Sequence, residues 1–437
     1  MTEPEILVIG AGAAGLLAAR ELSRAGRHVL VLEARPRIGG RIHTFNGAGF
    51  SGPTEAGAEF LHGEVALTRE LLQEIGVATH DTAGTTYEVE NGLLQTAESF
   101  LAEMPLLLAK LHALPHDLPL ADFLTKYFSE DEHQPLRETV TRFAEGYDAA
   151  DARRASSFAL RDEWSGGGAE DSPRPAGGYG PLIHHLAQQV QAAGGVVQLS
   201  TIVQQIRWRR GRVELRCDQN RRYSAAQVLL TVPLGVLQAE AGTPGHLAFE
   251  PELPAPRAAA AALGFGPVIK ILLEFRTSFW QYTGPEIRNA APELGFLFSD
   301  AAVPTWWSQL PEERPLLTGW VAGPAADALR NATDEEVFTQ SLAALAYLFG
   351  ATAEFLHSQL VTWRVVNWGA DPFARGAYAY ATVDSAAARR ELARPLDDTL
   401  FFAGEGLYEG PAMGTVEAAL VSGQQAARQL LAASRTL

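Results

Sequence analysis

The chain is almost devoid of cysteine. Cys217 is the single cysteine in 437 residues, which excludes an intramolecular disulfide and any metal site built on a cysteine cluster. The neighbouring residues His184 and His185 lie in a predicted helix that has no carboxylate at ligand spacing. We therefore predict no metal site.

Long apolar runs are missing as well. No run of about eighteen consecutive apolar residues occurs, so the sequence predicts no transmembrane helix. The chain is apolar from Ile6 onward, but Glu3 and Glu5 stand where a signal peptide would have positive charge. We expect a soluble, cytoplasmic protein.

Positive charge is scarce relative to negative charge. The formal net charge is −16 at pH 7, which disfavours nucleic acid and anionic membranes as partners. The same charge mildly favours cationic ligands, although an acidic surface alone explains it. Apolar residues make up 47% of the chain, an ordinary value for a globular protein of one to three domains. We expect a small-molecule substrate and a monomer or homodimer.

The start of the chain carries a nucleotide-binding pattern. The β-branched run Ile6–Ile9 predicts a buried strand. Gly10, Gly12 and Gly15 follow with the spacing G-x-G-x-x-G, then an apolar helix, and then a second predicted strand over residues 28–32. This order of elements predicts the βαβ unit that binds dinucleotides.

Each glycine of this turn has a physical reason. Gly10 allows the tight turn, Gly12 lets the backbone approach a pyrophosphate, and Gly15 lets the helix pack against the strand. The N-terminus of the helix, with its free N–H groups around Ala13 and Ala14, would then face the phosphates.

The segment after the second strand narrows the choice of dinucleotide. Glu33 can accept hydrogen bonds from ribose hydroxyls and would repel the 2′-phosphate of NADP. Gly39, Gly40 and Arg41 follow, which a plain NAD site does not need. The glycines would let the chain pass close to the pyrophosphate, where Arg41 would add a charge-assisted contact. FAD is therefore the expected dinucleotide. Two intervening residues are assigned to the same site, Ala34 and Arg35.

The continuation resembles a known family. The run Arg35-Pro-Arg-Ile-Gly-Gly-Arg41 is similar to the flavin-dependent amine oxidases, which include monoamine oxidases, polyamine oxidases and lysine-specific histone demethylases. The resemblance returns in residues 401–406, Phe-Phe-Ala-Gly-Glu-Gly, and in residues 414–423, so it spans nearly the whole chain. It implies non-covalent FAD, because residues 355–437 lack a cysteine like the one that tethers flavin in monoamine oxidases.

The resemblance and the order of elements together predict an α/β fold. We expect a discontinuous, Rossmann-like FAD-binding domain and a substrate-binding domain built from a mixed sheet and helices. The FAD-binding segments are assigned to residues 1–80, 191–248 and 386–437. The helical part of the substrate domain is assigned to residues 81–190, and its sheet to residues 249–385.

Lys270 interrupts a strongly apolar predicted strand, residues 269–275, where an unpaired lysine is costly to bury. In the family that the chain resembles, the lysine of such a segment contacts flavin N5 through a water, which implies that role for Lys270. The other interpretation is a lysine on an edge strand that faces solvent.

The run from Trp368 to Tyr380 resembles one in polyamine oxidases and histone demethylases. The resemblance implies that Trp368 packs near the flavin and that Tyr378 lines the substrate cavity, where aromatic faces attract an amine. Tyr380 is a further candidate for the same cavity. The alternative is that all three are ordinary core aromatics.

Five more residues are assigned by resemblance. Gly57, Ala58 and Glu59 match the stretch beside the isoalloxazine ring, and His62 falls where polyamine oxidases place a polar residue near the substrate chain. His62, with Glu59, is a candidate for holding a second amine, and the alternative for both is a solvated loop. Val203 falls where family members hold adenine with backbone groups.

The C-terminal blocks complete the expected flavin site. Gly404 and Glu405 resemble residues near ribitol and pyrophosphate, and Thr415 with Val416 begins a predicted helix. The N-terminus of this helix would point at flavin O2, where its dipole stabilises the charge of reduced flavin. Thr415 also stands where monoamine oxidases have a second substrate tyrosine, so one wall of the pocket is expected to be less aromatic.

The sequence thus predicts an FAD-dependent amine oxidase. It would oxidise the C–H bond beside an amine nitrogen to an imine, which water converts to a carbonyl, while O2 becomes H2O2. A polyamine-like or long alkyl amine is favoured, and an aryl or alkyl monoamine is the alternative. A desaturase or porphyrinogen-type oxidase shares both ends of the pattern, but Lys270 and the run from Trp368 argue against it. An alternative outside the enzymes is a non-catalytic interaction protein that binds FAD.

Overall fold

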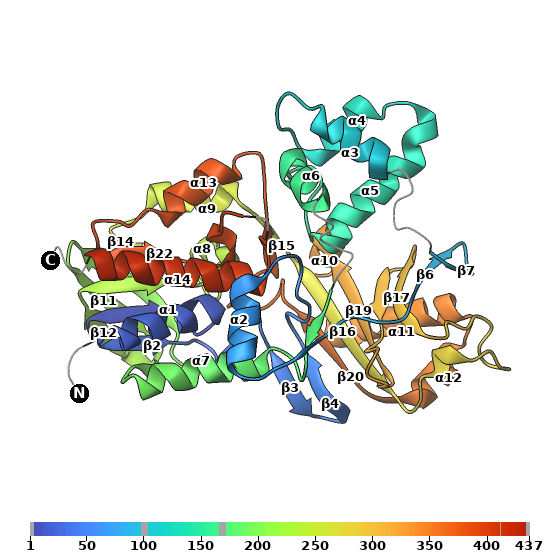
Figure 1. Ribbon diagram of the computed structural model, residues 1–437, viewed down its shortest axis with the longest axis horizontal. Helices are drawn as coiled ribbons and strands as arrows, with labels where there is room; N and C mark the ends of the chain where they lie inside the picture. The colour runs from blue at the N-terminus through green and yellow to red at the C-terminus, as the bar shows by residue number, and fades with distance from the viewer. Residues whose placement is uncertain (1–3, 98–103, 166–171, 411, 434–437) are drawn as a thin grey trace.

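The computed structural model describes residues 4–97, 104–165, 172–410 and 412–433. In the view of Figure 1, parallel strands and their helices lie on the left, a large sheet lies on the right, and a group of helices stands above that sheet. This mixture of sheets and helices confirms the predicted α/β class.

A five-stranded parallel sheet lies at the centre of the left-hand part, with the order β22-β13-β1-β2-β9. The central strand β1 pairs in parallel with β13 on one side and β2 on the other. All four residues of β1 are buried, as expected for a parallel strand covered on both faces. The strands come from distant parts of the chain: Ile6–Ile9 (β1), Val29–Leu32 (β2), Val196–Gln198 (β9), Gln227–Leu230 (β13) and Leu400–Phe402 (β22).

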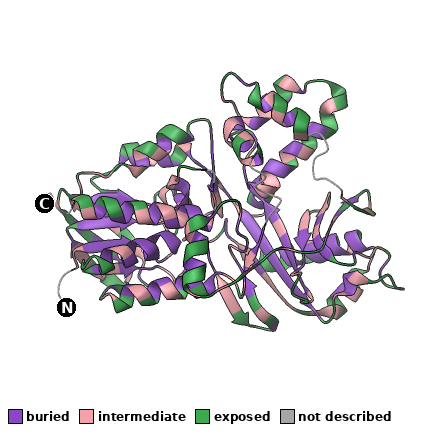
Figure 2. Cartoon of the chain, viewed as in Figure 1, coloured by how far each residue is buried: buried purple, intermediate pink, exposed green. Residues whose placement is uncertain are grey.

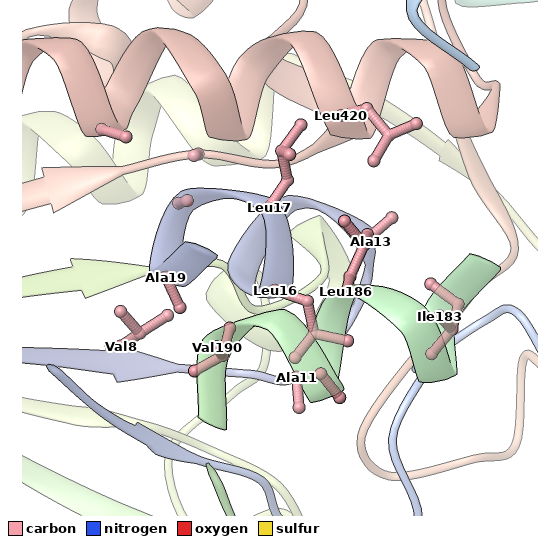
Figure 3. Close-up of a cluster of buried hydrophobic side chains, with 14 of the residues drawn as sticks. Val8, Ala11, Ala13, Leu16, Leu17, Ala19, Ile183, Leu186, Val190 and Leu420 are labelled. Carbon is pink, nitrogen blue, oxygen red and sulfur yellow. The ribbon is translucent and has the colours of Figure 1, made fainter. Parts of the chain in front are cut away.

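Three helices cover one face of this sheet: α1 (Ala13–Arg24), α7 (Gly180–Ala192) and α14 (Val416–Ala433). Helix α1 packs between the other two, and its apolar residues meet theirs in one buried cluster (Figure 3). Each fully buried leucine stabilises the fold by about 1.5–3 kcal/mol relative to an exposed one. The cluster includes Leu16, Leu17, Leu186 and Leu420.

The opposite face is covered by a four-stranded sheet, in the order β12-β11-β10-β14. The predicted hairpin over residues 203–217 is present here, as the antiparallel pair β10 and β11. The strands are Val203–Arg209 (β10), Arg212–Cys217 (β11), Arg222–Ala225 (β12) and Ala248–Glu250 (β14).

A seven-stranded sheet forms the right-hand part, with the order β20-β16-β19-β18-β17-β6-β7. Helices α11 (Asp334–Phe349) and α12 (Ala353–Gln359) bury one of its faces in an apolar cluster. The strands are Thr85–Glu90 (β6), Leu93–Thr96 (β7), Val268–Phe275 (β16), Leu294–Ser299 (β17), Thr305–Trp307 (β18), Leu316–Ala322 (β19) and Leu360–Asn367 (β20).

The helices above this sheet have a small core of their own. They are α3 (Met104–His112), α4 (Leu120–Tyr127), α5 (Gln134–Tyr147) and α6 (Ser157–Ser165). The stretch assigned to the helical part, residues 81–190, also includes β6 and β7 of the large sheet, and α7, which packs against α1. The domain boundaries given above stay a prediction.

Short elements connect these parts. Strand β15 (Gly264–Gly266) pairs with β21 (Tyr378–Tyr380), β3 (Thr44–Gly47) with β4 (Phe50–Glu55), and β5 (Thr79–His80) with β8 (Arg174–Pro175). The remaining helices are α2 (Ala66–Glu74), α8 (Leu234–Leu237), α9 (Pro254–Ala262), α10 (Gly323–Ala328) and α13 (Ser385–Ala393).

Burial follows these layers. The central strands are buried, and the outer helices turn exposed faces to solvent (Figure 2). Within the described part of the chain, no helix is both long and apolar enough to cross a membrane.

Candidate active site

The glycine turn between β1 and α1 has the geometry that a pyrophosphate requires. Gly10 has a φ of +109°, which L side chains rarely adopt. A Cβ on Gly15 would come within 2.0 Å of the Gly10 carbonyl oxygen, so only glycine fits at this crossing of helix and strand. A Cβ on Gly12 would meet only the Gly39 carbonyl oxygen, at 3.9 Å, and Gly12 provides no side-chain cap for α1, which leaves the first N–H groups of the helix open to an anion.

Glu33 is fixed at the end of β2. Its carboxylate accepts hydrogen bonds from the backbone N–H of Ala11 (2.8 Å) and of Arg35 (2.9 Å), and the residue is buried. A carboxylate has about four acceptor positions. Two therefore remain for ribose hydroxyls.

Arg41 and Glu405 were predicted from opposite ends of the chain and lie together. The Nη1 of Arg41 donates to Glu405 Oε1 at 2.7 Å and to the carbonyl oxygen of Ala377 at 2.6 Å. Arg35 also has a carboxylate partner, Asp371, at 2.6 Å. Each guanidinium is thereby held at the edge of the nucleotide site.

One cavity of about 1380 Å³ connects the glycine turn with the large sheet and the helices above it. Gly15 alone among the predicted site residues does not line it, since Gly15 packs inside the helix–strand crossing. The predicted residues on its wall are Gly10, Gly12, Ala13, Ala14, Glu33, Ala34, Arg35, Gly39, Gly40, Arg41, Gly57, Ala58, Glu59, His62, Val203, Lys270, Trp368, Tyr378, Tyr380, Gly404, Glu405, Thr415 and Val416.

Lys270 lies in the middle of this cavity wall. Its strand β16 pairs with β19 on one side and β20 on the other, so the interpretation as a solvent-facing edge lysine is wrong. Alternation along β16 sends Ile269 and Ile271 into the core and turns Lys270 the other way. Lys270 is 1% exposed, and its Nζ donates to Glu59 Oε2 at 2.6 Å and to the Gly57 carbonyl oxygen at 3.2 Å.

Glu59 has further partners within this cluster. Besides Lys270, Arg174 pairs with its Oε1 at 2.9 Å, and the Trp307 indole N–H donates to Oε1 at 3.0 Å. Burial alone would raise the pKa of Glu59, but the charges of Lys270 and Arg174 outweigh it and hold the pKa below its ordinary value. Glu59 thus accepts hydrogen bonds from Lys270 and Trp307, and its role in holding a second amine stays a prediction.

Six rings form a closed circuit beside Lys270, which we call the aromatic chamber. Ring centroids lie 5.6 Å apart for Phe60 and Trp307, 5.8 Å for Trp307 and Trp320, and 6.5 Å for Trp320 and Tyr378. The Tyr378 hydroxyl donates to the Tyr147 carbonyl oxygen at 2.5 Å. His62 closes the circuit, 5.7 Å from the Tyr147 ring and 5.8 Å from the Phe60 ring.

His62 is electrically neutral near pH 7. Burial lowers its pKa to about 4, and its Nδ1 lies 3.2 Å from the Ser172 hydroxyl and 3.4 Å from the Tyr147 hydroxyl. A neutral imidazole does not repel a cationic ligand.

The remaining predicted residues line other parts of the same cavity. The Trp368 indole N–H donates to the Ala56 carbonyl oxygen at 3.0 Å, which holds the ring beside Gly57. Helix α14 begins at Val416, where the Thr415 hydroxyl accepts a hydrogen bond from the Ala418 N–H as a cap. Tyr380 also packs into the core of the helices α3–α6.

The sequence interpretation missed four rings of the chamber, Phe60, Tyr147, Trp307 and Trp320, and it also missed Arg174, the partner of Glu59. Strand alternation was the available signal for Trp307. Its neighbour Trp306 is buried in the sheet core, so Trp307 must face the opposite side, which Lys270 shares. Arg174 and Tyr147 had no such local signal, because their partners lie far away along the chain.

The described residues therefore fit FAD. An open helix N-terminus, a buried acceptor for ribose and a cavity that reaches an aromatic chamber with a lysine are typical of flavin-dependent oxidoreductases. Within the described ranges, no group of three or more His, Cys, Asp and Glu side chains forms a metal site.

The chain matches the family of flavin containing amine oxidoreductases over residues 13–431, and it belongs to that family. It is accordingly a flavin-dependent amine oxidase with FAD as its cofactor, which confirms the family, the enzyme class and the cofactor predicted from the sequence.

Among curated relatives, polyamine oxidase 4 of Oryza sativa subsp. japonica is 29% identical over 98% of this chain and 89% of its own length. Lysine-specific histone demethylase 1 homolog 3 of Arabidopsis thaliana is 28% identical over 98% of this chain, which spans only 30% of that longer protein.

Solved structures with the same fold include putrescine oxidase bound to putrescine, with a TM-score of 0.78, 22% identity, and coverage of 98% of this chain and 99% of the other. Cyclohexylamine oxidase from Brevibacterium oxydans IH-35A has a TM-score of 0.78 and 22% identity, with 99% of each chain covered.

Proposed function

We propose that this protein oxidises an elongated aliphatic amine and uses O2 as the electron acceptor. The observation that supports the proposal most is the aromatic chamber, which adjoins the predicted flavin wall and has Lys270 on its border. When bound, FAD supplies the acceptor for a hydride equivalent from the carbon beside the amine nitrogen and passes the electrons to O2, which gives H2O2.

The chamber would bind and orient the amine. Ring faces attract a cation, and they also pack along an aliphatic chain without competing for its nitrogen. Trp307, Trp320 and Tyr378 together offer such faces on one side. The amine reacts as its neutral form, because the nitrogen lone pair assists cleavage of the adjacent C–H bond. Water then converts the imine to a carbonyl and releases an amine or ammonia.

Lys270 would position a water at the reacting end. Its ammonium has three N–H donors, of which Glu59 and the Gly57 carbonyl take two. The third donor would hold a water between Lys270 and the flavin site. The ion pair with Glu59 holds the ammonium in place, and Arg174 pairs with the other oxygen of Glu59.

A compact monoamine is the second candidate. The faces of the chamber rings would also suit a compact apolar amine, and one solved structure with the same fold is named cyclohexylamine oxidase. The polyamine oxidase relative and the putrescine oxidase structure instead support the elongated amine.

The experiment is a peroxide assay on the purified holoenzyme with a panel of amines. The panel contains spermine, N-acetylspermine, 1,4-diaminobutane, alkylamines, cyclohexylamine, benzylamine and phenethylamine. Amine-dependent peroxide supports the proposed reaction, and the ranking of kcat/KM separates the two substrate classes. A panel that yields no peroxide and no flavin reduction would overturn the proposal.

A further inference from the structure

Arg174 is a charged side chain that lies behind the cavity wall. It belongs to the short strand β8, and its side chain is 14% exposed. Among the described residues, those that line the cavity include Glu59 and Lys270 but not Arg174. Any effect of Arg174 on a ligand in the cavity must therefore pass through other residues.

Backbone groups fix the guanidinium of Arg174 in place. Its Nη1 donates to the Leu310 carbonyl oxygen at 3.1 Å, and its Nη2 donates to the Ser308 carbonyl oxygen at 3.1 Å. Its Cζ also lies 4.6 Å from the centroid of the Phe60 ring, as in a cation–π contact. In the backbone, Arg174 pairs with His80 of β5. None of these contacts involves Glu59, so Arg174 is a fixed point against which Glu59 can be held.

Glu59 lies in a segment without regular secondary structure, residues 58–60. Its position therefore depends on side-chain partners. The Oε1 of Glu59 accepts a hydrogen bond from the Trp307 indole and lies 2.9 Å from Arg174 Nε, a contact with ion-pair distance but without hydrogen-bond geometry. Burial would raise the pKa of Glu59, yet the charges of Lys270 and Arg174 hold the pKa below its ordinary value. Glu59 is thus an ionised carboxylate that Arg174 attracts from behind the wall.

The Nζ of Lys270 depends on the same segment. A lysine has a flexible four-carbon stem, so a rigid strand alone does not fix its ammonium. The two printed acceptors of the Nζ are Glu59 Oε2 at 2.6 Å and the Gly57 carbonyl oxygen at 3.2 Å, and both belong to residues 57–59. A continuous set of contacts therefore leads from the backbone around Arg174, through Glu59, to the Nζ on the cavity wall.

We propose that Arg174 is a positioning residue for the oxidation: it holds Glu59 from outside the cavity, and Glu59 in turn holds the Lys270 Nζ beside the flavin site. This assignment rests on the role given to Lys270 in the proposed function. It deepens that function, because it makes the flavin chemistry depend on a residue that touches neither the amine nor the cofactor.

A purely structural role for Arg174 makes a different prediction. Removing one partner of a buried ion pair lowers the stability of the fold, wherever the pair lies. A structural Arg174 would therefore change the Tm and leave the properties of bound FAD unchanged. A positioning Arg174 changes the properties of bound FAD as well, and does so only while Lys270 is present.

Arg314 provides the matched control. It pairs at 3.5 Å with Glu274, a buried carboxylate further along the same strand as Lys270. Like Arg174, Arg314 donates to a backbone carbonyl oxygen, that of Pro53, at 2.7 Å. Among the described residues of the cavity wall, neither Arg314 nor Glu274 is present. Arg314→Gln thus removes a comparable ion pair at a place outside the cavity.

The first measurement needs no amine. It is the midpoint potential of bound FAD, obtained by anaerobic titration with a reference dye, in wild type, Arg174→Gln, Lys270→Met and the double variant. We expect Arg174→Gln to shift the potential in the same direction as Lys270→Met. The double variant should have the potential of Lys270→Met alone, because Arg174 acts through the Nζ. Arg314→Gln should keep the wild-type potential.

The second measurement is stopped-flow kinetics of both flavin half-reactions, with O2 for reoxidation and the best amine of the peroxide panel for reduction. Arg174→Gln should slow the half-reaction that Lys270→Met slows, by about tenfold, since small misplacements of a positioned group are costly. In the Lys270→Met background, the same change should alter that rate by less than about twofold. Arg314→Gln should leave both rates at the wild-type values.

Two results overturn the assignment. One is a wild-type potential with wild-type rates in folded Arg174→Gln, while Lys270→Met changes them. The other is an effect of Arg174→Gln that is equally large in the Lys270→Met background. If Arg174→Gln does not fold, Glu59→Gln decides the matter, because the proposed route passes through Glu59 and an unchanged potential with unchanged rates would exclude it.

Failure of the proposed function is seen separately. If Lys270→Met itself changes neither the potential nor a rate, the role proposed for Lys270 is wrong, and the assignment of Arg174 is wrong with it. The proposed amine oxidation fails only if no amine reduces the bound FAD of the wild-type protein, which the potential measurement does not depend on.

Discussion

Lys270 and Glu59 form a buried ion pair at 2.6 Å between Nζ and Oε2, although 211 residues separate them in the chain. The pair lies on the cavity wall between the predicted flavin site and the aromatic chamber. Arg174 and Trp307 hold Glu59 from the other side. The buried lysine is thereby held in place, and Glu59 and the Gly57 carbonyl use two of its three N–H donors.

Replacing Lys270 with methionine should leave FAD bound and slow at least one flavin half-reaction. Glu59 keeps Arg174 and Trp307 as partners, so the site does not retain a bare buried charge. We expect a decrease of about tenfold or more in flavin reduction or reoxidation, measured by stopped flow. Lys126→Met, at an exposed position on α4, is the control. Unchanged rates in both half-reactions would remove Lys270 from the site.

Replacing Glu163 with glutamine should stabilise the protein at alkaline pH. A raised folded-state pKa makes a carboxyl favour the folded state only while it is protonated, and this advantage is lost as pH rises from about 4.5 to about 7. Glutamine does not ionise, so the variant does not lose this stability as pH rises. Its Tm should therefore exceed that of wild type by roughly 1–3 °C at pH 8, with a smaller difference at pH 5. An equal gain at both pH values, or a gain in Asp162→Asn at the neighbouring surface position, would refute the link to the raised pKa of Glu163.

The absence of a cysteine in residues 355–437 predicts that FAD is held without a covalent bond. Acid precipitation of the yellow holoenzyme should release all FAD into the supernatant, as measured by absorbance. Flavin that remains in the washed pellet would show a covalent link.

Turnover at low amine concentration should increase from pH 6 to pH 9. An alkylamine is protonated over most of this range, with an ordinary pKa of about 10, and only its neutral form has a free lone pair. His62 has a pKa of about 4, so its titration does not contribute in this window. The measurement is the pH profile of kcat/KM for butylamine, with His62→Gln as control. A flat profile, or one that the control shifts, would contradict this account.

The sequence predicted the nucleotide end of the site better than the substrate end, for a physical reason. The G-x-G-x-x-G turn is local, and the φ of Gly10 and the tight packing of Gly15 follow from its spacing. The burial of Lys270 could also be predicted, because the strand around it is apolar. The partners of Lys270 could not, since Glu59 and Arg174 come from distant loops and strands.

Asp148 and Glu163 illustrate the same limit. Asp148 directly follows α5 and Glu163 lies in α6, and no local pattern indicates that both line one cavity. The aromatic chamber likewise depends on how β18, β19 and β21 face α5. The prediction of a less aromatic wall at Thr415 was local to that position and did not anticipate the rings opposite it.

The most direct test of the central claim is anaerobic stopped-flow reduction of the FAD-loaded protein by single amines. The account predicts bleaching of the oxidised flavin by 1,4-diaminobutane or spermine, with a higher second-order rate constant than for benzylamine or cyclohexylamine. Faster bleaching by the compact amines would show that the preferred substrate is a compact monoamine and not an elongated amine. Flavin that stays oxidised with every amine would contradict the proposed function itself.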